Sequence, residues 1–144
     1  MSKTKCASSE ALDAHDKWAV ECMAKYGFYI HFVFDNDFDN SPSGVNLHTH
    51  GISESKNHHD FQITVPLDPE VVSGIFHNLY DRVSDGEVFA AGDIVHDILG
   101  NDLEITFIEA EECGRTVLRV ILPDPAGNLT KTKMQKKWKA AQYG

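Results

Sequence analysis

The chain has 144 residues, of which 42% are hydrophobic and 24% charged, and its formal net charge is −9. These values are typical of one globular domain and argue against wholesale disorder. No apolar run reaches the ~18 residues that a membrane-spanning helix requires, and the N-terminal sequence lacks the uninterrupted apolar core of a secretory signal.

Charge is distributed unevenly along the chain. Residues 1–127 contain all 22 acidic side chains against 8 basic ones, a net charge of −14, whereas residues 128–144 contain five lysines and no acid. An acidic body repels a phosphate backbone and few apolar anchors stand in the tail, so we expect neither a nucleic-acid nor a membrane partner. We expect a single α+β domain at 1–128 and a Lys-rich tail at 129–144 that can form a short helix.

The three cysteines are Cys6, Cys22 and Cys113. They are far apart and odd in number, so they form neither a disulfide framework nor a Cys-x-x-Cys metal clip. A reduced, cytoplasmic protein is therefore expected.

The first third of the chain is predicted to form a helix followed by a strand. Apolar residues recur at three- and four-residue steps over residues 8–26, which favours an amphipathic helix. The aromatic and β-branched segment 28–34 follows as a strand, in which His31 shares a face with Tyr29 and Val33. We interpret His31 as a structural residue.

Two more strands and a second helix come next. The strands are expected at residues 45–52 and 60–66, on either side of a polar loop at 53–59. Residues 68–86 form the clearest helix of the chain, because Asp68 can cap its N-terminus and a proline occupies the first helical position.

The remaining strands are predicted at residues 103–112 and 114–122. Runs of adjacent strands favour an antiparallel or mixed sheet. The predicted fold class is therefore α+β, with a mostly antiparallel sheet of five or six strands and two main helices packed on one face.

Histidines concentrate in the segment VNLHTHGISESKNHHDF. His48 and His50 are two residues apart in a predicted strand, so both project from the same face. His58 begins the next strand and could supply a third imidazole, which matches the ~3 protein ligands of a catalytic Zn²⁺ ion. Glu54 and Asp60 are then the candidate catalytic carboxylates that assist a metal-bound water.

Structural explanations compete with these assignments. Histidines on a polar strand face or in a loop are often solvent-exposed or hydrogen-bonded without binding a metal. Arg119 lies in an apolar strand, on the face of Val117 and Ile121, and we interpret it as a paired structural cation.

Two families share short patterns with this sequence. The stretch HTHGISE is similar to the His-x-His-x₃-Glu core of the cupin metal motif, but the flanking glycine spacings differ and the helix at 68–86 stands where a cupin needs strands. About residues 14–122 resemble a family of small, mostly bacterial domains of unknown function, through three short elements and the Arg-x-x-x-Arg strand. The elements are Tyr26-Gly27-Phe28, His48-Thr49-His50-Gly51-Ile52 at a Tyr-Thr-x-Gly-Leu motif, and His58-His59-Asp60-Phe61 at a His-Pro-Glu-Leu motif.

The resemblance implies an α+β fold and no established activity. Only His58 matches a histidine of that family, so a metal site would belong to a His-rich subgroup. The sequence thus supports two hypotheses. One is a site of His48, His50 and His58 that binds Zn²⁺ or another divalent ion for metal-assisted hydrolysis of an unidentified small-molecule substrate. The other is a non-enzymatic interaction or regulatory module, such as a homodimer, with polar surface histidines.

Overall fold

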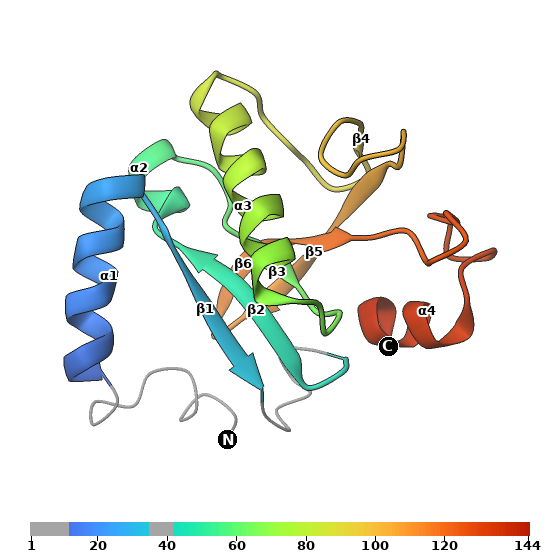
Figure 1. The fold of residues 1–144 in the computed structure, drawn as a ribbon, viewed down its shortest axis with the longest axis horizontal. Coiled ribbons are helices and arrows are strands. Elements are labelled where there is room, and N and C mark those ends of the chain that lie inside the picture. Colours follow the sequence, from blue (N-terminus) through green and yellow to red (C-terminus); the bar gives the residue numbers. More distant parts are fainter. Residues whose placement is uncertain (1–11, 35–41) are drawn as a thin grey trace.

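The computed structural model describes residues 12–34 and 42–144 (Figure 1). The N-terminal stretch from which we inferred the absence of a secretory signal, and the predicted first turn of helix 8–26, lie outside the described residues. The elements are α1 (Leu12–Tyr26), β1 (Tyr29–Phe34), β2 (Val45–His50), α2 (Ile52–Lys56), β3 (Phe61–Ile63), α3 (Pro69–Ser84), β4 (Ile94–Val95), β5 (Ile105–Glu112), β6 (Arg115–Ile121) and α4 (Lys136–Tyr143).

The six strands form one sheet in the order β1-β2-β3-β6-β5-β4. All neighbouring strands are antiparallel except β3 and β6, which are parallel. This confirms the predicted α+β class with a mostly antiparallel sheet. Two elements differ from expectation: β4 has only two residues, too few to show an alternating pattern, and α2 forms where a polar loop was predicted.

Helix α3 forms where the sequence signals are strongest. The Asp68 side chain accepts a hydrogen bond from the Glu70 amide at 2.8 Å, and Pro69 opens the helix. Helix α1 lies beside α3, with the rings of Tyr26 and His77 in edge contact at 5.1 Å. The face of α3 that packs on the sheet consists of Val72, Ile75, Phe76, Leu79 and Val83.

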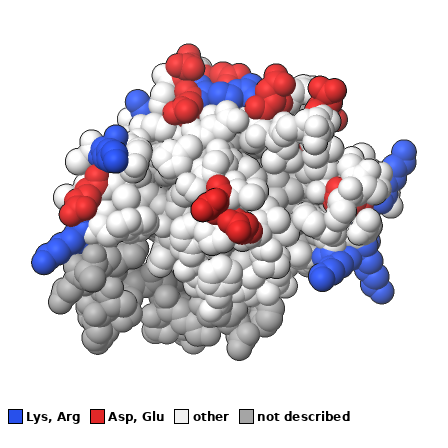
Figure 2. Space-filling model, viewed as in Figure 1, with Lys and Arg blue, Asp and Glu red and all other residues white. Residues whose placement is uncertain are grey.

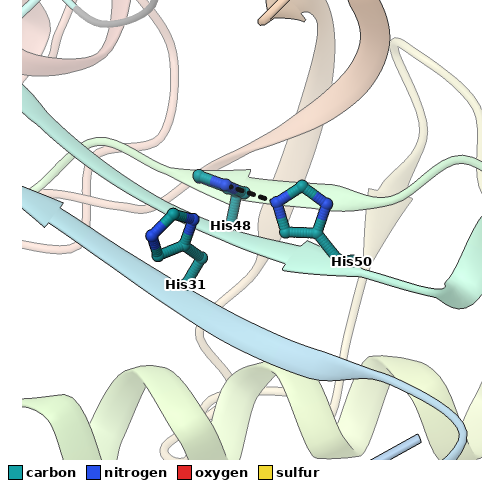
Figure 3. Close-up of side chains that lie close together, drawn as sticks. All are labelled: His31, His48 and His50. Atoms are coloured by element: carbon teal, nitrogen blue, oxygen red, sulfur yellow. Dashed lines mark hydrogen bonds between the residues drawn. The ribbon is translucent and has the colours of Figure 1, made fainter. Parts of the chain in front are cut away.

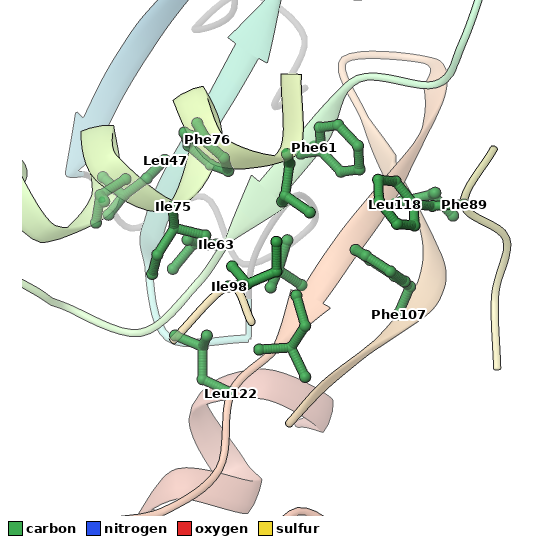
Figure 4. Packing of buried hydrophobic residues seen from close by; sticks show 14 of the residues in the cluster. Leu47, Phe61, Ile63, Ile75, Phe76, Phe89, Ile98, Phe107, Leu118 and Leu122 are labelled. Atoms are coloured by element: carbon green, nitrogen blue, oxygen red, sulfur yellow. The ribbon is translucent and has the colours of Figure 1, made fainter. Parts of the chain in front are cut away.

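The hydrophobic core lies between α3 and one face of the sheet. Figure 4 shows Ile75 and Phe76 of α3 near Leu47 and Ile63 of the sheet. An aromatic group extends this core toward β5, in which Phe61, Phe89 and Phe107 make mutual ring contacts at 5.3–6.2 Å. Because alternate residues of a strand point to opposite faces, the other face of the sheet is left to a different set of side chains.

The Lys-rich C-terminal segment packs onto the end of the sheet. Within α4, Gln142 is fully buried, and its side chain exchanges two hydrogen bonds with the backbone of Leu122. The Ala141 carbonyl accepts a hydrogen bond from the Thr64 hydroxyl at 2.8 Å. Basic side chains gather at the edge of the molecule where α4 lies (Figure 2), so the tail docks through neutral groups while its lysines face solvent.

Two sequence inferences concern membranes and cysteines. Among the described residues, no helix is both long and apolar enough to cross a membrane. Cys22 is a free thiol, but Cys113, in the turn between β5 and β6, is disulfide-bonded. The expectation of reduced cysteines is therefore wrong at Cys113, because sequence spacing does not show which thiols the fold brings within bonding distance.

Candidate metal centre

Three histidines converge on the face of the sheet opposite α3 (Figure 3). The antiparallel pairing of β1 and β2 places His31 directly across from His48. His50 follows His48 by two residues in β2 and so projects from the same face. Each histidine offers one ring nitrogen, and the three nitrogens lie within 4.8 Å of one another.

The spacing of the rings is close to that of a metal site. His48 Nε2 and His50 Nε2 are 2.9 Å apart, and the ring of His31 lies 5.1 Å from that of His48, centroid to centroid. In a tetrahedral Zn²⁺ site with Zn–N bonds of ~2.0 Å, ligand nitrogens are ~3.3 Å apart. Small rotations of the side chains therefore suffice to surround an ion. Only His48 is fully buried, with an exposed fraction of 1%, while the other two rings are partly buried.

A chain of hydrogen bonds across three strands determines which nitrogen of His48 carries a proton. Arg119 can only donate, and its Nε donates to Gln62 Oε1 at 2.7 Å, so the amide nitrogen of Gln62 must point the other way. That nitrogen donates to Asn46 Oδ1 at 2.9 Å. Asn46 Oδ1 is also 2.9 Å from His48 Nδ1, which must therefore be the protonated nitrogen.

The consequence is that the Nε2 lone pair of His48 faces the other imidazoles. A metal-binding histidine commonly donates its second ring N–H to a neighbouring acceptor, which orients the ring. Asn46 provides this acceptor for His48. Arg119 thus acts through neutral hydrogen-bond partners, Gln62 and the Gln142 carbonyl, and the described residues show no carboxylate paired with it, contrary to the expected ion pair. Burial lowers the pKa of Arg119 to about 10, at which it remains charged at neutral pH.

The environment of His48 favours the neutral imidazole that a metal ion requires. Burial is the main cause that lowers the pKa of His48 well below its usual value, and the nearby His50, His31 and Arg115 lower it further. A neutral imidazole is the form that coordinates metal ions.

This pKa predicts a pH dependence of stability in the metal-free protein. The unfolded chain protonates His48 near pH 6.5, whereas the folded chain resists protonation, so unfolding takes up a proton below that pH. We expect the free energy of unfolding to fall as the pH decreases from 6.5, by up to ~1.4 kcal/mol per pH unit from this residue. Urea unfolding of the wild type and of His48→Gln between pH 7.5 and 5 measures it. Parallel pH profiles of the two proteins would contradict the assignment.

A buried ionic network borders the histidine cluster. Glu112 Oε2 lies 3.5 Å from His48 Nε2, and Glu112 Oε1 accepts a hydrogen bond from Arg115 Nε at 2.9 Å. Arg115 also donates to Asp60 Oδ2 at 3.0 Å and to the Thr49 carbonyl at 2.6 Å. The two carboxylates have exposed fractions of 1% and 2%. One arginine therefore neutralises two buried acids and ties the β5–β6 turn to the end of β2.

The structure does not bring His58 into this cluster. His58 Nδ1 donates to its neighbour's carbonyl, that of His59, at 2.8 Å, and His58 Nε2 accepts from the Phe89 amide at 3.0 Å. Both ring nitrogens are thus engaged, and the lone pair that a metal would need is already used. The third imidazole comes instead from His31, which we had interpreted as structural. His58 fixes the loop before β4 to the start of β3.

The two carboxylates selected from the sequence also lie in other settings. Glu54 is exposed on α2. Asp60 is buried, and besides Arg115 it accepts hydrogen bonds from the Thr49 hydroxyl and from the first amides of α2, those of Ile52 and Ser53. Burial raises the pKa of Asp60, while these donors and Arg115 oppose the increase. Asp60 therefore caps α2 and holds Arg115, and its oxygens are occupied.

A signal for His31 was present in the sequence. Residues 28–34 and 45–50 are consecutive strand predictions, and an antiparallel pair between them places one residue of each strand side by side. The register that pairs His31 with His48 joins two like residues of the same predicted polar face. No such signal exists for Glu112, which stands among several acids near a turn, 64 positions after His48.

Comparison with known proteins identifies no relative. The sequence matches no protein-family model, and searches of the curated proteins and of the solved structures found no significant match. The resemblance to a family of domains of unknown function stays a prediction. The assignment of a metal centre therefore depends on the geometry of His31, His48 and His50 themselves.

Proposed function

We propose that this protein binds a divalent transition-metal ion through His31, His48 and His50, with Zn²⁺ as the first candidate. The observation that carries the proposal is the convergence of the three ring nitrogens within 4.8 Å. Imidazole nitrogens suit Zn²⁺, Cu²⁺, Fe²⁺ and Ni²⁺ and are poor ligands for Mg²⁺ or Ca²⁺.

The surroundings of the cluster support binding over a chance grouping. The orientation of His48 is set by Asn46, which is itself held by Gln62, so a ligand nitrogen is positioned before any ion arrives. The low pKa of His48 keeps that nitrogen unprotonated at neutral pH. Ordering of ligands in advance reduces the entropy that binding must overcome.

Metal-assisted hydrolysis is the reaction class that we propose for such an ion. Three histidines hold Zn²⁺ in catalytic sites where a bound water loses a proton at a pKa of about 7. The expected result is cleavage of an activated ester, such as p-nitrophenyl acetate, that depends on added Zn²⁺ and disappears in His50→Ala. Equal rates with and without the ion would leave metal binding in place but exclude this reaction.

Metal content tests the binding itself. The full chain without a histidine tag is titrated with Zn²⁺, and we expect one ion per chain in the wild type and none in His31→Ala or His48→Ala. His59→Ala is the matched control, because His59 is an exposed histidine outside the cluster and its loss should leave the stoichiometry at one. If the wild type and the two cluster variants bind equally, the proposal is wrong and the non-enzymatic alternative is preferred.

A further inference from the structure

The geometry points to Glu112 as a fourth protein ligand of the ion held by the three histidines. This inference rests on the proposed metal function and assigns the site a carboxylate that is remote in the sequence. Glu112 ends β5 and belongs to the same buried cluster as His48.

The distance between the two side chains suits a shared ion. Glu112 Oε2 lies 3.5 Å from His48 Nε2, which is long for a hydrogen bond between them. Two ligands of a tetrahedral ion with bonds of ~2.0 Å are ~3.3 Å apart. The pair therefore stands at the separation that two ligands of one ion require.

The proton positions give an independent reason. His48 Nδ1 carries the ring proton, because it faces the acceptor Asn46 Oδ1, so His48 Nε2 presents a lone pair. Glu112 Oε2 presents lone pairs as well, since a carboxylate only accepts. Two acceptors that face each other in a buried site repel, and a cation between them turns the repulsion into two favourable contacts.

Arg115 positions the proposed ligand. It donates to Glu112 Oε1 and leaves Oε2 directed at His48. It also donates to the carbonyl of Thr49, the residue between His48 and His50. One guanidinium thus ties the carboxylate to the strand that carries two of the imidazoles, and this compensates for the lack of any direct pairing between β5 and β2.

A carboxylate ligand changes what the site can do. Three neutral imidazoles leave the full charge of a divalent ion in the protein interior, whereas Glu112 cancels one unit of it. With four protein ligands, a tetrahedral ion is closed to water, and water binds when coordination rises to five.

The test compares Glu112→Gln with Glu111→Gln. Glu111 precedes Glu112 on β5, is exposed, and loses the same charge when it is replaced by glutamine. Zn²⁺ affinity is measured by titration against a competing chelator, and Co²⁺ spectra report the ligand set. We expect affinity to fall about 10–100-fold or more in Glu112→Gln with an altered Co²⁺ spectrum, and neither to change in Glu111→Gln.

The outcomes separate the inference from the proposed function. Unchanged affinity and spectrum in Glu112→Gln overturn the ligand role but leave the three-histidine site standing. Failure of the wild type to bind Zn²⁺ overturns both. If Glu112→Gln does not fold, a crystal structure of the wild type with Zn²⁺ decides: a metal–Oε2 distance of ~2.0–2.2 Å supports the inference, and one above ~3 Å overturns it.

Discussion

Replacing Arg115 with methionine is expected to lower the free energy of unfolding by about 3–5 kcal/mol. Methionine retains much of the apolar stem but removes the charge that Asp60 and Glu112 share. Both carboxylates are almost completely buried, so neither can turn to water when its partner is lost. Urea unfolding at pH 7.5 measures the difference from the wild type.

Arg82→Met is the matched control for this experiment. The two arginines are similarly exposed, at 28% and 29%, but Arg82 pairs with Glu87, whose side chain is 44% exposed. We expect a loss of only about 1 kcal/mol there, because an exposed carboxylate is solvated after its partner is removed. In Arg115→Met the loss should shrink as the pH falls toward 4, since the unpaired acids then become neutral. Equal losses in the two variants would show that the buried network contributes nothing special.

Zinc is expected to raise the stability of the folded chain by ~4 kcal/mol when its free concentration is about 1,000 times the dissociation constant. The physical reason is that the three imidazoles meet only in the folded state, so an ion bound there shifts the unfolding equilibrium. For a chain of this length the midpoint of thermal unfolding should rise by roughly 10 °C. A thermal scan with and without Zn²⁺ measures the shift, and a chelator should reverse it.

The variants make the origin of this shift specific. His48→Ala is expected to abolish it, whereas His59→Ala should retain it in full, because only the first removes a residue of the cluster. A shift that survives in His48→Ala would mean that the ion binds elsewhere on this His-rich chain. His58→Ala distinguishes a further case. It should lower stability through the loss of the Phe89 contact but keep the zinc shift.

Much of the fold follows from local chemistry. The boundaries of α3 depend on Asp68, Pro69 and a stripe of apolar residues, all of which are visible in a single turn or two of sequence. The strands at 29–34, 45–50, 105–112 and 115–121 were predicted for the same reason, since aromatic and β-branched runs favour extended chain. Element β4 was missed because two residues carry no period, and α2 because its N-terminus is capped by Asp60 from outside the helix.

The candidate site divides in the same way. That His48 and His50 share a face is a property of any strand, and the sequence by itself determined it. Which third imidazole joins them depends on the β1–β2 register, which selected His31, while the Phe89 amide occupied His58.

The approach of Glu112 depends on how the β5–β6 turn folds against β2, with Arg115 bonded to Thr49. Side-chain direction within a strand is set by backbone geometry two residues long and can be predicted from the sequence. Distances between strands are set by register, twist and the packing of the whole core, and only the tertiary structure decided them.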